Sequence, residues 1–142
     1  MKDRIDKASI LSTANIQCSP IRMTRKGKED EVSKAKDAEK LRICFDVLQN
    51  KIAPSGETEI SVRIISPDGS TIQMQSLGSG TFKEATTGNE IPFTYNISPD
   101  YQNDTKTVCS YWAQTFKFAA GKYSVEVYEK GFLIGQSSFM MK

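Results

Sequence analysis

The sequence predicts an all-β protein, an immunoglobulin-like sandwich of two antiparallel sheets with seven or eight strands. Short runs in which apolar and polar residues alternate recur along the chain, and clusters of Gly, Pro, Asn and Asp separate them. No stretch shows the apolar spacing of a convincing amphipathic helix. A closed barrel is the alternative, but a proline in the first strand and a long irregular loop in the middle favour the sandwich.

The composition is that of one globular domain. A chain of 142 residues can bury about two-thirds of its unfolded surface, enough for a core without metal or disulfide support. The net charge of +2 is too small to indicate nucleic acid or an anionic membrane as a partner. The sequence has no histidine, which removes the commonest general base and zinc ligand. We therefore expect a protein that is not an enzyme and uses no cofactor or metal.

The predicted organisation is a charged tail over residues 1–9 and one sandwich domain over residues 10–142. Met1–Arg4 is not followed by the apolar segment of a signal peptide, and no run approaches the length of a transmembrane helix. We expect no membrane contact from these residues. A cytoplasmic domain and one anchored to the envelope through a segment outside the sequence are both compatible with this pattern.

The first half of the domain is predicted to hold an edge strand, a charged segment and two regular strands. Residues 10–25 form a strand broken at Pro20, because proline cannot donate to a ladder. Residues 26–40 are expected to be a charged loop or short helix, and their mixed signs argue against a nucleic-acid patch, which concentrates one sign on one face. Residues 41–47 and 60–64 alternate as half-buried strands do.

The second half begins with a turn, Ser66-Pro67-Asp68-Gly69, where Pro67 presets φ and Gly69 accepts a positive φ. Residues 77–90 are expected to form a long Gly-rich loop. Strands follow at residues 91–97 and 105–118. Residues 121–142 form a hairpin with Lys130-Gly131 at its turn. Its expected inward residues are Tyr123, Val125, Val127 and Phe139.

The three cysteines are expected to be free, packed thiols. Cys44 alternates with the apolar residues of its strand and so points away from the core. A bridge across the core to Cys109 would need both side chains to point inward, with Cα atoms about 4.4–6.8 Å apart. That disulfide is the less favoured alternative. Cys18 is interpreted as an apolar filler, because no basic neighbour is evident that would lower its pKa.

The motifs for metal or phosphate binding are missing. Asp68, Asp100 and Asp104 lie beside turn residues and are expected to cap the local backbone, since the DxDxDG calcium pattern does not occur. Residues 78–80 resemble a P-loop only in their glycines. Most aromatic side chains of the last third are expected to fill the core. The possible binding surface consists of Tyr128, Glu126, Trp112 and Tyr111, and Tyr128 is the best candidate for exposure.

Several short motifs follow one another in the second half of the chain: Tyr101-Gln102-Asn103, Val108-Cys109-Ser110-Tyr111-Trp112, Gly121-Lys122-Tyr123, Ile134-Gly135 and Phe139. In these motifs, residues 41–142 resemble a family of bacterial β-sandwich domains. Val62-Arg63-Ile64 and Pro67-Asp68-Gly69 match the family's earlier strand and turn. The resemblance implies a C-terminal module preceded by coiled-coil sequence. Some members are labelled chromosome-partitioning ParA proteins, a label that does not transfer because the chain has no Walker motif.

Three functions are compatible with these observations. The favoured prediction is a non-catalytic interaction or scaffolding module, part of a longer chain, that binds protein and not nucleic acid. The alternative is a sandwich that binds a small ligand or carbohydrate through Trp112, Tyr128 or the 77–90 loop. The third is an enzyme that uses carboxylates or a cysteine.

Overall fold

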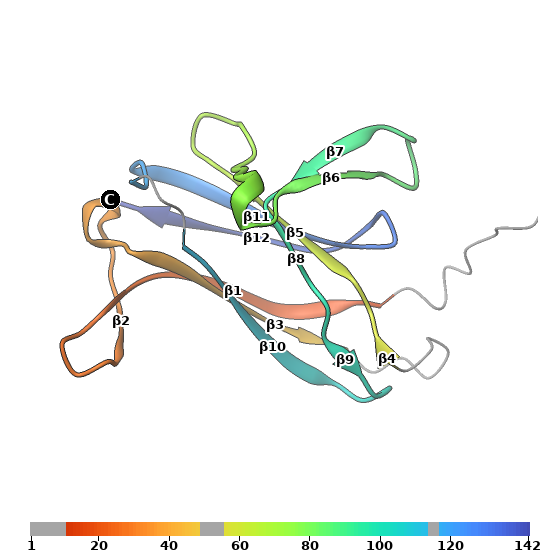
Figure 1. Cartoon of the computed structure of the whole chain (residues 1–142), viewed down its shortest axis with the longest axis horizontal. Helices are drawn as coiled ribbons and strands as arrows, with labels where there is room; N and C mark the ends of the chain where they lie inside the picture. Colours follow the sequence, from red (N-terminus) through yellow and green to blue (C-terminus); the bar gives the residue numbers. More distant parts are fainter. Residues whose placement is uncertain (1–10, 49–55, 114–116) are drawn as a thin grey trace, which may run out of the picture.

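The computed structural model describes residues 11–48, 56–113 and 117–142, which form a two-layer β-sandwich (Figure 1). One four-stranded sheet has the order β10-β3-β1-β2 and the other the order β12-β11-β5-β8. All strand pairs are antiparallel. The predicted all-β sandwich is confirmed. The described residues form twelve strands instead of seven or eight, because several short pairs join the main ones. None of them forms a helix long and apolar enough to cross a membrane.

The first sheet contains β1 (Thr13–Met23), β2 (Glu29–Glu31), β3 (Lys40–Val47) and β10 (Lys106–Trp112). β3 alternates strictly between buried and half-buried residues, the period-two pattern that its sequence predicts. The prediction that β1 is an edge strand broken at Pro20 is wrong. β1 lies between β3 and β2 and continues through Pro20. Pro20 is accommodated because it lies just beyond the short β1–β2 ladder.

The second sheet contains β5 (Ile60–Ile65), β8 (Tyr95–Ile97), β11 (Gly121–Glu129) and β12 (Phe132–Met141). β11 and β12 form the hairpin that the sequence predicts, and the turn residues Lys130 and Gly131 have φ of 54° and 84°. The register shifts between Val127 and Tyr128. Tyr123, Val125 and Val127 are buried, and Phe139 packs against the core from a partly buried position.

Two small strand pairs complete the fold: β4 (Gly56–Glu57) with β9 (Asp100–Tyr101), and β6 (Gly80–Lys83) with β7 (Glu90–Phe93). The expectation of a long loop over residues 77–90 is therefore wrong. The glycines and the Thr-Thr-Gly-Asn sequence form the ends of the β6–β7 hairpin. This hairpin is held to the second sheet because Phe82 packs against Tyr128, with ring centroids 4.8 Å apart.

The charged segment 26–40, expected to be a charged loop or short helix, contains a strand besides a short 3₁₀ helix. It holds β2 and a 3₁₀ turn, η2 (Ala35–Asp37); a second 3₁₀ turn, η3, spans Gln75–Leu77. Ala35 is buried, and its N–H donates to the carbonyl oxygen of Lys142 at 2.8 Å. This bond and the Lys142 N–H to Ser33 carbonyl bond tie the segment to the end of β12.

The core lies between the two sheets and is closed along one side by β1 and β12. The Thr13 hydroxyl donates to the carbonyl oxygen of Ile134 at 2.6 Å. β12 can approach β1 this closely because position 135 is glycine. The largest fully buried side chains come from both sheets and their flanking segments: Tyr101, Tyr123, Phe45, Leu11, Ile21, Leu41, Ile43, Ile60, Ile64, Met141, Val62 and Val125.

Candidate functional site

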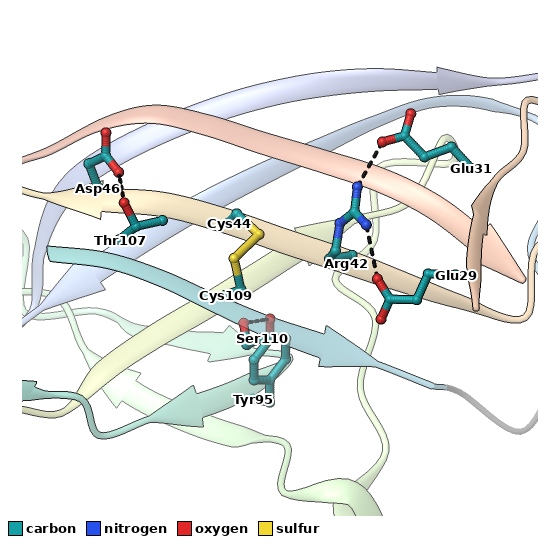
Figure 2. The surroundings of a disulfide bond; sticks show 9 residues. All are labelled: Glu29, Glu31, Arg42, Cys44, Asp46, Tyr95, Thr107, Cys109 and Ser110. Carbon is teal, nitrogen blue, oxygen red and sulfur yellow. Dashed lines mark hydrogen bonds and ion pairs between the residues drawn. A yellow bond between two sulfur atoms is a disulfide. The ribbon is translucent and has the colours of Figure 1, made fainter. Parts of the chain in front are cut away.

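The outer face of the first sheet gathers polar side chains from three strands (Figure 2). Tyr111, Cys109 and Thr107 of β10 lie opposite Arg42, Cys44 and Asp46 of β3. This face is set by parity, since the alternate residues of β3 fill the core. The Thr107 hydroxyl donates to Asp46 at 2.6 Å, which is one of the bonds that lower the pKa of Asp46.

A disulfide between Cys44 and Cys109 lies at the centre of this face. The expectation of free thiols at these two positions is wrong. Cys44 does point away from the core, as its alternation predicts. However, β3 and β10 are neighbours in one sheet, and their register places the two cysteines directly opposite each other with Cα atoms 4.1 Å apart. Parity excludes a bridge across the core and permits one between adjacent strands. Cys18 is the free cysteine, and burial raises the pKa of its thiol.

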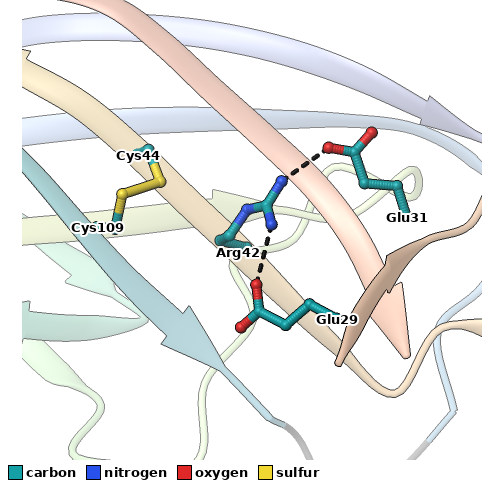
Figure 3. Close-up of polar contacts among 5 residues, drawn as sticks. All are labelled: Glu29, Glu31, Arg42, Cys44 and Cys109. Atoms are coloured by element: carbon teal, nitrogen blue, oxygen red, sulfur yellow. Dashed lines mark hydrogen bonds and ion pairs between the residues drawn. A yellow bond between two sulfur atoms is a disulfide. The ribbon is translucent and has the colours of Figure 1, made fainter. Parts of the chain in front are cut away.

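Arg42 organises the charges beside the disulfide (Figure 3). Its guanidinium donates to Glu29 at 2.9 Å and to Glu31 at 2.7 Å, and both carboxylates come from β2. Hydrogen bonds from the Tyr111 hydroxyl and from Arg42 lower the pKa of Glu29. The hydrogen bond to Glu29 raises the pKa of Arg42. The two β2 carboxylates that share a face therefore pair with one guanidinium, and the three groups together keep a charge of −1.

The turn between β1 and β2 carries positive charge that this pairing leaves uncompensated. The Thr24 N–H donates to the Lys28 carbonyl at 2.8 Å, and Gly27 completes the turn with φ of 78°. Arg25, Lys26 and Lys28 are exposed, and no carboxylate of the described residues forms an ion pair with them. We refer to these three residues as the basic turn. In the sequence, the Glu-Asp-Glu spacing after the turn is the feature that could indicate a shared cationic partner for Glu29 and Glu31. Alternation along a strand places these two carboxylates on one face.

The four residues of the predicted binding surface do not lie together. Tyr111 is on the outer face of the first sheet and is 44% exposed. Trp112 is buried and stacks on Tyr95, with ring centroids 5.9 Å apart. The Glu126 carboxylate is on the second sheet, where it accepts from Arg63 at 2.9 Å.

The expected exposure of Tyr128 is wrong. Tyr128 is only 5% exposed because Phe82 of the β6–β7 hairpin covers its ring. Its hydroxyl donates to Glu126 at 3.0 Å. Burial and this neighbouring carboxylate raise the pKa of Tyr128 to about 12. Nothing in the local sequence indicates this cover, because the hairpin comes from residues more than thirty positions away in the chain.

The outer face of the second sheet holds an open groove of about 390 Å³. Serine, glutamine and charged side chains line most of it, among them Lys122, Ser124, Glu126 and Gln136. Within the described residues, no group of three or more Cys, Asp or Glu side chains could hold a metal ion.

Together these features define a compact β-sandwich domain with a charged outer face and a basic turn. Residues 14–142 match the model of a domain of unknown function, DUF8428, and the chain belongs to that family. A search of curated proteins finds no match to the sequence. The resemblance to bacterial coiled-coil proteins stays a prediction, since the family description names no such protein.

Among solved structures, the chain is similar to Pseudomonas fluorescens alkylpurine DNA glycosylase AlkC bound to DNA containing an abasic site analog. The TM-score is 0.50 and the sequence identity 13%, over 94% of this chain and 31% of the glycosylase chain. This chain thus spans about a third of that protein's length, and the likeness concerns the fold. It corrects the predicted function. The expected protein-binding scaffold and its carbohydrate-binding alternative both leave out DNA, to which this structural neighbour is bound.

Proposed function

We propose that this domain contacts the phosphate backbone of DNA through the basic turn. The observation that carries the proposal is the turn itself, with three exposed cations on consecutive or near-consecutive positions and no carboxylate partner among the described residues. Lys and Arg side chains supply most phosphate contacts, and a hairpin tip can approach a duplex without steric obstruction.

The arrangement of charge along the sandwich supports the same interpretation. The end with the basic turn, η2 and the C-terminus also carries Lys34, Lys36 and Lys142 (Figure 1). The same end also carries Glu29, Asp30 and Glu31, each of which forms an ion pair with Arg42 or Arg22. The exposed cations outside these pairs attract a polyanion locally.

The structural neighbour adds a second line of support. AlkC was solved bound to DNA, and this chain shares its fold over a region of that protein. We do not transfer glycosylase activity. Our proposal is a domain that binds without catalysis or cofactor, since the carboxylates of the candidate site are engaged in ion pairs and hydrogen bonds. We also propose that the sandwich is immunoglobulin-like.

Fluorescence anisotropy with a labelled 20-base-pair duplex tests this proposal. The variant Arg25→Gln/Lys26→Gln/Lys28→Gln removes the basic turn, and Lys83→Gln/Lys106→Gln/Lys130→Gln removes equal charge near the opposite end. The unmodified domain should bind with a non-specific Kd of roughly 10⁻⁴ to 10⁻⁶ M. A plot of log K against log salt should have a slope of about −3 if all three cations contact phosphates.

The turn variant should lose most of its affinity and most of its salt dependence, whereas the control variant should retain both. Absence of duplex binding by the unmodified domain at low salt would contradict the proposal. Equal losses in the two variants would also contradict it, because they would show an effect of net charge alone.

A further inference from the structure

We propose that Tyr111 is a stacking platform for an unpaired DNA base, next to the phosphate contacts of the basic turn. This inference rests on the proposed function and specifies its substrate as DNA with exposed bases. Tyr111 is one of the few large apolar side chains that are exposed, at 44%. It lies on the outer face of β10, directly opposite Arg42 of β3.

The Tyr111 ring is held in place before any ligand binds. Its register partner Arg42 is itself fixed, because the guanidinium donates to Glu29 at 2.9 Å. The Lys40 ammonium lies 4.5 Å from the ring centroid and adds a cation–π contact. Two residues along the strand, Cys109 is bonded to Cys44 and pins β10 to β3. A ring held this way loses little conformational entropy when a base stacks on it.

The platform and the basic turn are neighbours in space. Glu29, which accepts from Arg42 directly opposite Tyr111, follows Lys28 of the basic turn in the chain. A DNA strand whose phosphates lie along the basic turn therefore passes the Tyr111 ring. Lys40 occupies one side of the ring with a positive charge, which also favours an approaching phosphate.

The geometry favours unpaired over paired bases. In a duplex the faces of the bases are covered by their neighbours, so an aromatic side chain on a flat sheet cannot reach them. In a single strand or at a gap the faces are open, and base–aromatic stacking combined with a basic groove is the usual mode of binding.

Two labelled 20-nucleotide probes separate stacking from charge. One is oligodeoxythymidine, and the other carries an abasic analog at every position and so has equal phosphate charge without bases. The unmodified domain should bind oligodeoxythymidine about tenfold more tightly than the abasic strand. Tyr111→Ala should remove this difference, and Tyr111→Phe should keep most of it. Leu133→Ala, at another exposed position, serves as the control and should change nothing.

The outcomes distinguish this inference from the proposed function. Equal affinity of the unmodified domain for the two strands would overturn the stacking role while leaving duplex binding by the basic turn intact. A tenfold preference for oligodeoxythymidine that persists in Tyr111→Ala would also overturn the stacking role and leave duplex binding by the basic turn intact. The basic-turn variant should bind both single-stranded probes more weakly, by an equal factor. If its affinity for neither probe falls, the proposed function fails while the stacking result stands by itself.

Discussion

A single buried hydroxyl group can form the hydrogen bonds that strand pairing does not provide to backbone atoms. Thr94 lies between β7 and β8 and is completely buried. Its hydroxyl accepts from the Ile64 N–H at 2.9 Å and donates to the Ile72 carbonyl at 2.8 Å. The side chain thereby connects the end of β5 to two segments that do not continue its ladder. Alternation in the sequence gives no signal for this role, because a threonine suits a strand equally well on either face.

Thr94→Val should destabilise the domain by about 1–3 kcal/mol, because it keeps the shape but leaves a buried N–H and a buried carbonyl without a partner. Urea denaturation would measure the loss. Thr94→Ser retains the hydroxyl and should recover the larger part of it. If the valine and serine variants were equally stable, the hydroxyl would not be the stabilising group.

The carboxylate of Asp68 should make the stability of the domain depend on pH, and this dependence can be assigned to one turn. Hydrogen bonds from the Ser66 and Ser70 hydroxyls and from the Ser70 N–H lower its pKa from 3.8 to about 2. A lowered pKa means that this contribution to stability is complete above about pH 4 and is lost as the pH falls through 2.

A carbon-detected NMR titration should place the midpoint of Asp68 near 2 and show it rising toward 3.8 in Ser66→Ala/Ser70→Ala. Ser138→Ala, on the exposed surface of β12, is the control and should leave the midpoint unchanged. A midpoint near 3.8 in the unmodified protein would show that the turn does not hold the carboxylate in solution.

At the scale of elements, the disulfide constrains the edge of the first sheet. It joins strands whose cysteines are 65 residues apart in the chain. A bridge that closes so long a loop restricts the unfolded chain strongly, so its loss should cost about 2–4 kcal/mol. Urea denaturation with and without dithiothreitol would measure this difference. The variant Cys44→Ser/Cys109→Ser should match the reduced protein and should not respond to the reductant. Equal stability of the unmodified protein in both conditions would contradict the bridge.

Elements whose pairing is local could be predicted, and those that depend on distant partners could not. The alternation in β3 and the Lys130-Gly131 turn each specify a strand or a hairpin from a few consecutive residues. The β6–β7 hairpin has little alternation, and it is positioned because Phe82 meets Tyr128 from another hairpin. The Cys44–Cys109 pairing required the β3–β10 register, which sequence spacing does not contain. For the candidate site, Tyr111 could be named from the sequence, whereas the basic turn required the knowledge that Arg42 pairs with the β2 carboxylates.

At the scale of the whole molecule, one glycine allows the two sheets to meet. A Cβ atom at Gly135 would lie 2.0 Å from the Thr13 Oγ1 and 2.5 Å from the Ile16 Cδ1. Gly135→Ala should therefore destabilise the sandwich by about 1–3 kcal/mol through overpacking. The double variant Thr13→Ala/Gly135→Ala should lose less than the sum of the single changes, since the first contact is then absent. Strictly additive losses in urea denaturation would show that the two positions are not in contact.

The position of the disulfide on the outer face has a consequence for the order of folding. The bond lies outside the apolar core, which is formed by side chains that point away from it. Pairing of β3 with β10 in this register places the two cysteines opposite each other. Because the core does not depend on the bond, the reduced chain should reach the same topology, and the bond can then form in the folded protein.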